Sequence, residues 1–247
     1  HASLAEALAQ SGYLVAALRH PGDNWQDGSL RQTNLARYAT ARPQQASRVI
    51  DALLKDPEWK DRIATDAKGP RVGALGHSAG GYTVLALAGA RPDPARFDAH
   101  CATDRARDPI FCSTGDGAAP ATAAIPALAD ARVRAVVALA PMGAVLTAAS
   151  LSQVRIPIAV YVAQLDRFLV PRFHGEWVAA HIPGVELHRV SNAWHFAFMD
   201  PASMPIASED GDISANPPGF DRKALLSQLQ RELPAFFDKA LSCQGCR

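Results

Sequence analysis

The fold is decided by the stretch Gly76-His77-Ser78-Ala79-Gly80. An apolar segment at 71–75 precedes it, and a helical segment at 82–88 follows it. A strand, a tight turn and a helix in this order form the setting in which a nucleophilic serine stands on a strained turn. We expect glycine at 76 and 80 because the neighbouring backbones approach closely and leave no room for a Cβ. Ser78 is therefore the candidate nucleophile; the alternative is a serine in an ordinary glycine-rich turn.

Apolar and helical segments alternate outward from this stretch. We expect helices at 2–11, 44–55, 174–180 and 221–239, and buried strands at 12–18, 71–75, 132–140, 156–163 and 185–190. Unbroken apolar strands separated by helices predict an α/β fold with a mainly parallel sheet covered on both faces. Ligands of such sheets bind beyond the carboxyl ends of the strands. We interpret 1–247 as one domain, N-terminally incomplete because the chain begins at His1 already in helical rhythm.

The stretch at about 91–131 interrupts this alternation. It is rich in Pro, Asp and Ala and has no sustained hydrophobic period. A long excursion of this kind is often a lid or a pocket wall, and a surface loop without contact to substrate is the alternative. Cys101 and Cys112 lie within it and can form a disulfide. Cys243 and Cys246 stand at the C-terminal end, where neither a thioredoxin-like motif nor a zinc site is favoured.

Composition limits the classes of partner. The formal net charge is +1 over 247 residues, and no block of lysine or arginine occurs, which gives no reason to expect nucleic acid. No apolar stretch reaches the roughly 18 residues that span a bilayer. A small ester is the expected partner, and the oligomeric state is left open. The even number of cysteines favours a periplasmic or secreted protein over a cytoplasmic one.

A serine hydroxyl needs a base to take its proton and an acid to orient that base. Where the serine stands on such a turn, the partners follow in the order Ser, Asp or Glu, His. Asp166 comes just after the predicted strand at 156–163, and His195 comes just after the one at 185–190. Of the histidines after Asp166, His195 alone stands at the end of a predicted strand. The order predicts a triad of Ser78, Asp166 and His195, which needs neither a metal nor an organic cofactor; a turn-forming Asp166 and a structural His195 are the alternatives.

The oxyanion of an acyl-transfer reaction needs preorganised N–H donors. One donor is expected from the backbone of Ala79, and the second from a loop that would precede His1. Candidate pocket residues follow a strand end or flank the candidate triad: Pro21, Gly22, Asp23, Trp25, His77, Phe168 and Trp194. Ordinary aromatic packing is the alternative for each of them.

Three stretches carry a resemblance to a known family: Pro70–Arg91 with the Ser78 motif, Arg19–Asp23, and Ala193–Phe196. The chain resembles the predicted dienelactone hydrolase group, which is related to plasma-type platelet-activating factor acetylhydrolases within the α/β-hydrolase superfamily. The resemblance implies an α/β-hydrolase fold that usually begins with further strands and a His-Gly-x-Gly-Gly-like oxyanion loop, neither of which is present in this sequence.

Two departures from that family are informative. Dienelactone hydrolases proper use a cysteine nucleophile, so Ser78 argues against their reaction. Plasma-type acetylhydrolases carry the acid after the preceding strand, but that place reads Leu139-Ala140-Pro141-Met142 without a carboxylate, which favours Asp166. The predicted activity is hydrolysis of carboxylic esters with short to medium acyl chains. Amide, thioester or peptide hydrolysis with the same triad, and a noncatalytic binding protein, are the alternatives.

Overall fold

The computed structural model describes residues 1–114, 125–208 and 211–242. Its central sheet has four parallel strands that neighbour each other in chain order: β3 (Val72–His77), β4 (Val133–Leu139), β5 (Ile158–Ala163) and β6 (Glu186–Val190). The register places His77 opposite Leu139, and Leu139 opposite Tyr161. The predicted parallel sheet is confirmed for these four strands.

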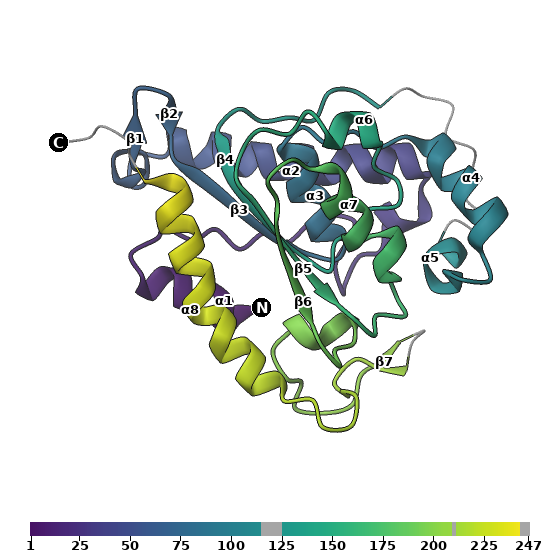
Figure 1. The fold of residues 1–247 in the computed structure, drawn as a ribbon. Helices are drawn as coiled ribbons and strands as arrows, with labels where there is room; N and C mark the ends of the chain where they lie inside the picture. The colour runs from purple at the N-terminus through teal and green to yellow at the C-terminus, as the bar shows by residue number, and fades with distance from the viewer. Residues whose placement is uncertain (115–124, 209–210, 243–247) are drawn as a thin grey trace.

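Helices cover both faces of the sheet (Figure 1). On one face lie α1 (Ala2–Gln10) and α8 (Arg222–Leu241), which pack against each other. On the other face lie α2 (Leu35–Lys55), α3 (Ala79–Leu87), α6 (Ala148–Leu151) and α7 (Gly175–His181). Two short hairpins stand apart from this sheet: β1 (Thr65–Asp66) with β2 (Gly69–Pro70), and β7 (Ala207–Ser208) with β8 (Gly211–Asp212).

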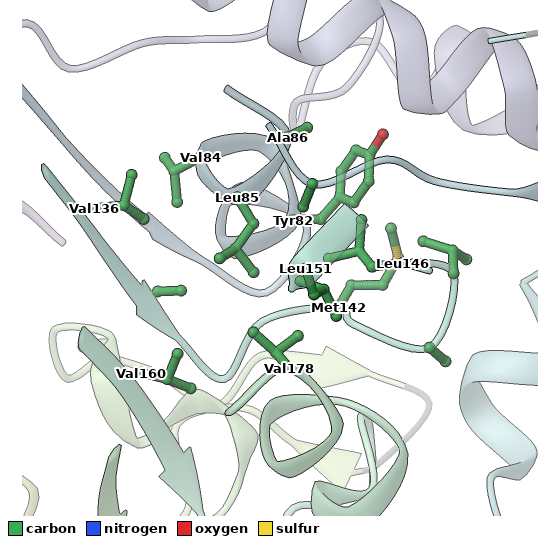
Figure 2. Packing of buried hydrophobic residues seen from close by; sticks show 14 of the residues in the cluster. Tyr82, Val84, Leu85, Ala86, Val136, Met142, Leu146, Leu151, Val160 and Val178 are labelled. Carbon is green, nitrogen blue, oxygen red and sulfur yellow. The ribbon is translucent and has the colours of Figure 1, made fainter. Parts of the chain in front are cut away.

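Alternate side chains of the strands build two separate cores. In β4, Ala135, Val137 and Leu139 face α1 and α8, whereas Val136 and Ala138 face α3 and α7. Figure 2 shows the second core, where Leu85 of α3 and Val178 of α7 pack beside strand valines. Full burial of one such side chain contributes roughly 1.5–3 kcal/mol. Since both faces are covered, β4 and β5 are apolar at nearly every position. Their sequences therefore do not alternate between apolar and polar residues.

The strand predicted at 12–18 is wrong. Residues 13–20 form no strand or helix, and Leu14 and Leu18 are 41% and 40% exposed. The backbone N–H of Tyr13 donates instead to the carbonyl of Leu8 at the end of α1, where Gly12 has a φ of +91°. An apolar run becomes a strand only beside another strand, and among the described residues β3 pairs with β4 alone.

Helix α2 begins nine residues earlier than the predicted helix at 44–55. Asn34 caps it by accepting a hydrogen bond from the N–H of Arg37 at 2.9 Å, and Pro43 is tolerated inside it. The other predicted helices agree with α1, α3, α7 and α8 within a few residues. No described helix is long and apolar enough to cross a membrane.

The excursion at 91–131 contains two helices, α4 (Pro94–Asp104) and α5 (Pro109–Ser113), within its described part. The expected disulfide between Cys101 and Cys112 is present and joins the two helices. The prediction for Cys243 and Cys246 lies outside the described residues.

Candidate active site

Ser78 stands between β3 and α3 with a strained backbone. Its φ is +58° and its ψ is −120°, a backbone conformation that residues other than glycine rarely adopt. Three backbone hydrogen bonds hold it there: its N–H donates to the carbonyl of Leu139 at 2.9 Å, and its carbonyl accepts from the N–H groups of Tyr82 and Met142, both at 3.1 Å. The end of β4, the loop after it and the first turn of α3 therefore fix the residue that the sequence predicts to be the nucleophile.

Close backbone approach explains Gly76 but not Gly80. A Cβ on Gly76 would lie 2.1 Å from the carbonyl oxygen of Gly80, whereas a Cβ on Gly80 would meet nothing nearer than Arg42 at 4.0 Å. The expectation that both positions exclude a Cβ is therefore wrong for Gly80. The second crowded position is Gly81, where a Cβ would lie 2.7 Å from the Cα of Pro141.

Asp166 and His195 are brought together by the loops that follow β5 and β6. The two loops extend the pairing of their strands, because the N–H of Gln164 donates to the carbonyl of Val190 and that of Leu165 to the carbonyl of Ala193. Asp166 Oδ2 lies 2.7 Å from His195 Nδ1, and both side chains are buried. Residues 29 apart in sequence thus form a buried acid–histidine pair at the carboxyl end of the sheet.

Hydrogen bonds to Asp166 indicate which nitrogen of His195 carries the ring proton. Asp166 Oδ1 accepts from the N–H groups of Phe168 and Leu169, both at 2.8 Å, which leaves Oδ2 to accept from His195 Nδ1–H. With its proton on Nδ1, a neutral imidazole presents a lone pair on Nε2. That Nε2 atom is buried and has no hydrogen-bond partner, so no such bond joins it to Ser78 within the described part of the chain. A buried acceptor without a partner costs stability, which is typical of a functional group.

Aromatic rings enclose His195. Phe168 stacks on it with ring centroids 5.0 Å apart, and Phe196 meets it edge-on at 4.9 Å. The ring of His77 lies 4.8 Å away, and its Nε2 donates to the carbonyl of His195 at 2.9 Å. Burial, followed by the nearby His195, holds the pKa of His77 well below its usual value, so His77 is neutral at pH 7. Predicted pocket residues Phe168 and His77 therefore lie directly beside His195.

The other predicted pocket residues make different contacts. Trp25 is 84% exposed, and Trp194 lies under the guanidinium of Arg167 at 4.8 Å. Asp23, which follows Pro21 and Gly22 in the same loop, forms ion pairs with Arg42 and Arg31. In the described structure no hydrogen bond, ion pair or ring contact joins Pro21, Gly22, Asp23 or Trp25 to the candidate triad.

Ala79 is the first residue of α3. The first N–H groups of a helix have no acceptor within the helix and carry the positive end of its dipole. Its N–H is therefore free of an intrahelical partner beside Ser78, as a donor to a negatively charged oxygen requires.

One group among the described residues has the composition of a metal site: His100, Cys101 and Cys112, with ligand atoms within 4.8 Å of one another. The two sulfur atoms are bonded to each other in the disulfide. Zinc is bound by thiolates, so this set does not offer the donors of a zinc site while the disulfide is intact.

A second buried acid–histidine pair escaped the sequence analysis. Asp108 Oδ2 lies 2.8 Å from His174 Nε2, and the two side chains are 0% and 1% exposed. Their separation of 66 residues and the place of Asp108 in an aperiodic stretch left no local signal for the pairing. Only the tertiary structure brings the residue before α5 to the residue before α7.

Comparisons with known proteins address the fold. No protein-family model matches the chain, and no curated protein matches it. The esterase domain of a Rhodothermus marinus protein superimposes with a TM-score of 0.50 at 13% identity, over 98% of this chain and 80% of that one. A structure from work on the metagenome-derived lipolytic enzymes LipS and LipT gives 0.49 at 16% identity, over 96% and 86%. With the parallel sheet and its helix layers, the first of these likenesses shows that the chain has the α/β-hydrolase fold.

Proposed function

We propose that this chain is a serine hydrolase that cleaves carboxylic esters of short to medium acyl chains through an acyl-enzyme. The observation that carries the proposal is the buried hydrogen bond of 2.7 Å between Asp166 and His195, which leaves His195 Nε2 with a free lone pair. The strained backbone of Ser78, which directly follows β3 of the same sheet, also supports the proposal.

The proposed reaction follows from these roles. His195 Nε2 takes the proton of Ser78 Oγ while that oxygen attacks the carbonyl carbon of the ester. The Ala79 N–H stabilises the oxyanion, a contribution of roughly 3 kcal/mol for one donor. His195 then gives its proton to the leaving alcohol, and the same base activates a water that hydrolyses the acyl-enzyme. Asp166 holds the tautomer and stabilises the imidazolium without taking the proton itself.

The enclosure of His195 supports an uncharged acyl group. The rings of Phe168 and Phe196 contact it, and neutral His77 adds no charge. A small neutral ester can displace water from such surroundings at little cost in free energy. A charged acyl group would lose its hydration without gaining a partner, which is unfavourable.

The proposal is tested with nitrophenyl esters of increasing acyl length. We expect turnover of the acetate and butyrate esters, a decline at long chains, and loss of activity by several orders of magnitude in Ser78→Ala. Ser152→Ala is the matched control, because its hydroxyl bonds only the carbonyl of Ala149 at an exposed position. Equal turnover in wild type and Ser78→Ala would refute the proposal. Turnover of anilides, thioesters or peptides in place of esters would replace the substrate class, and failure of all substrates would favour a binding protein.

The disulfide supports a further proposal, that the protein works in a periplasmic or secreted setting. Alkylation of the native protein in its host cells, before any reductant is added, should leave Cys101 and Cys112 unmodified by peptide mass spectrometry. Full alkylation of both would place the protein in a reducing compartment.

A further inference from the structure

Asp108 and His174 form a buried pair beside the candidate active site. Asp108 immediately precedes α5, and His174 immediately precedes α7. The pair makes no hydrogen bond to Ser78 or His195 themselves. Burial of two polar groups at this depth is costly unless each finds partners.

The hydrogen bonds of His174 define its tautomer. Its Nδ1 accepts from the N–H groups of Gly143 at 3.1 Å and Ala144 at 3.3 Å. Backbone N–H groups only donate, so the ring proton is on Nε2 and points to Asp108. Burial lowers the pKa of His174, which keeps the ring neutral near pH 7. Burial alone would raise the pKa of Asp108, but the hydrogen bonds from His174, His100 and the N–H of Val170 outweigh it, so the pKa is lowered and Asp108 is ionised.

From Asp108 the network reaches the loop that carries Asp166. Asp108 Oδ1 accepts from the N–H of Val170 at 3.4 Å, just beyond the two N–H groups that Asp166 itself engages. His174 ends the same loop, and Asp166 is near enough to influence its titration. The segment 166–174 is therefore tied to Asp166 at one end and to Asp108 at the other.

Through Nδ1 of His174 the network also reaches the loop that holds Ser78. The N–H groups of Gly143 and Ala144 belong to that loop, and the N–H of Met142 donates to the carbonyl of Ser78 at 3.1 Å. A Cβ on Gly143 would lie 2.5 Å from the carbonyl oxygen of His174, so the two loops are in close contact. One imidazole thus contacts the supports of both the nucleophile and the acid.

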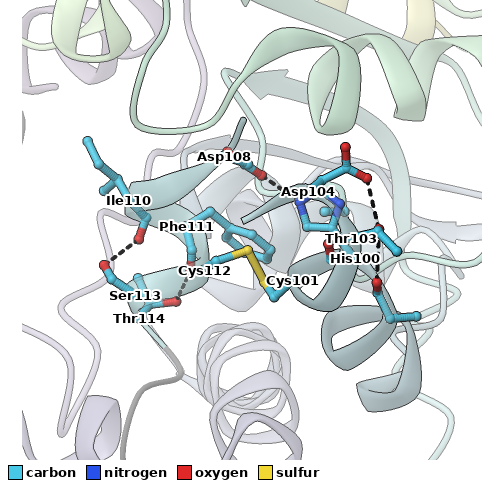
Figure 3. Close-up of a disulfide and its surroundings, with 12 residues drawn as sticks. His100, Cys101, Thr103, Asp104, Asp108, Ile110, Phe111, Cys112, Ser113 and Thr114 are labelled. Carbon is cyan, nitrogen blue, oxygen red and sulfur yellow. Dashed lines mark hydrogen bonds and ion pairs between the residues drawn. A yellow bond between two sulfur atoms is a disulfide. The ribbon is translucent and has the colours of Figure 1, made fainter. Parts of the chain in front are cut away.

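Asp108 is held on its other side by the disulfide-linked helices. Figure 3 shows Asp108 beside His100 and the bond between Cys101 and Cys112. His100 Nε2 lies 2.8 Å from the same Oδ2 atom that contacts His174. The disulfide ties α4 to α5. It therefore holds His100, on α4, beside Asp108, at the start of α5.

We propose that Asp108 and His174 are positioning residues, which set the loop 166–174 so that Asp166 is aligned with His195 for the reaction. The inference rests on the proposed serine hydrolase function. It gives the described helices α4 and α5 of the excursion at 91–131 a role in catalysis. Joined by the disulfide, they hold the loop that follows Asp166, and they do not act as a lid over the substrate. A misplacement of about 1 Å in a catalytic constellation can cost about 100-fold in rate.

The first test is Asp108→Asn, which keeps the shape of the side chain but replaces one acceptor by a donor. The new NH₂ must face either His174 Nε2–H or the N–H of Val170, and two donors repel. We expect kcat on a short nitrophenyl ester to fall about 10- to 100-fold with KM changed less than threefold. Asp104→Asn is the matched control: it is the same substitution four residues earlier, where the carboxylate pairs with Arg107 at an exposed position. Wild-type kcat in Asp108→Asn would overturn the proposal, and so would an equal loss in Asp104→Asn.

The second test separates the two edges of His174. Gln can place its amide nitrogen where Nε2 stands and still donate to Asp108, whereas Asn can place its oxygen where Nδ1 stands and still accept from Gly143 and Ala144. The proposal requires that His174→Gln retains more kcat than His174→Asn. The reverse order would mean that the loop at 143–144 alone matters. This comparison does not depend on whether Asp108→Asn folds.

A spectroscopic readout separates positioning from loss of stability. The proton between His195 Nδ1 and Asp166 gives a downfield resonance in proton NMR when the bond of 2.7 Å is ordered. We expect this resonance to broaden or move upfield in Asp108→Asn and to be unchanged in Asp104→Asn, in samples shown to be folded by circular dichroism. An unchanged resonance in folded Asp108→Asn would overturn the inference.

Failure of this inference is distinguishable from failure of the proposed function. If Ser78→Ala kept full turnover, the serine mechanism would fail whatever Asp108→Asn does. If Ser78→Ala were inactive while Asp108→Asn and both His174 variants matched wild type, the serine mechanism would stand and the positioning role would be refuted.

Discussion

Replacement of Gly76 by alanine should unfold the turn that presents Ser78, whereas the same change at Gly80 should not. A Cβ on Gly76 would lie 2.1 Å from the carbonyl oxygen and 2.3 Å from the carbonyl carbon of Gly80, and backbone atoms of a helix cannot rotate away. Helix α3 would have to withdraw from β3 by more than 1 Å to restore an ordinary contact. Tyr82 and Leu85 of this helix are fully buried, so the withdrawal would open gaps around them.

The expected magnitude follows from these contacts. Overpacking typically costs 1–3 kcal/mol, and the short contacts with backbone place Gly76→Ala at about 3 kcal/mol or more. Gly80 lies inside α3 with open space at its Cβ, so Gly80→Ala should stabilise the protein by roughly 0.5–1 kcal/mol through helix propensity.

Urea unfolding followed by circular dichroism measures both variants against wild type. The reasoning would be refuted if Gly76→Ala lay within 1 kcal/mol of wild type, or if the two variants lost equal stability. Equal losses would mean that the sequence motif, and not the observed contacts, determines where glycine is required.

Three further predictions concern stability. Ser78→Gly should be more stable than Ser78→Ala by about 1 kcal/mol, because only glycine adopts the observed φ of +58° without strain; equal urea midpoints would contradict this. Burial lowers the pKa of His77 in the fold, so the unfolded chain binds more protons as the pH falls. The stability of the fold therefore decreases below the ordinary histidine pKa of 6.5, by up to roughly 1.4 kcal/mol per pH unit for this group. His77→Gln should therefore lose less stability than wild type between pH 7.5 and 5.5, and an identical loss would show that His77 does not stay neutral. Changing both Cys101 and Cys112 to alanine opens a loop with a sequence separation of 11 and should cost about 3 kcal/mol; a loss under 1 kcal/mol would mean that the disulfide adds little to folding.

The sequence predicted the elements whose signals are local. The Ser78 stretch carries its own strand, turn and helix, and the apolar runs of β4 and β5 are buried on both faces, so their positions followed from the residues alone. The pairing of Asp166 with His195 also followed, because the ends of neighbouring parallel strands meet at one edge.

Features that depend on tertiary neighbours were not accessible in the same way. The run at 12–18 has the composition of a strand, but pairing depends on a neighbour that composition does not reveal. The roles of Gly80 and Gly81 were exchanged because the crowded contact of Gly81 is with Pro141, a residue of another loop. The pair Asp108–His174 joins two segments that have no periodicity in common, so burial and hydrogen bonding in the structure were needed to find it.

The measurement that tests the central claim most directly is labelling with a fluorophosphonate, which reacts with an activated serine. Peptide mass spectrometry of the labelled native protein should place the adduct on Ser78, and labelling should be lost in Ser78→Ala and strongly slowed in His195→Gln. An adduct on another serine, or an unlabelled Ser78 in folded protein, would contradict the assignment of Ser78, Asp166 and His195 as a catalytic triad.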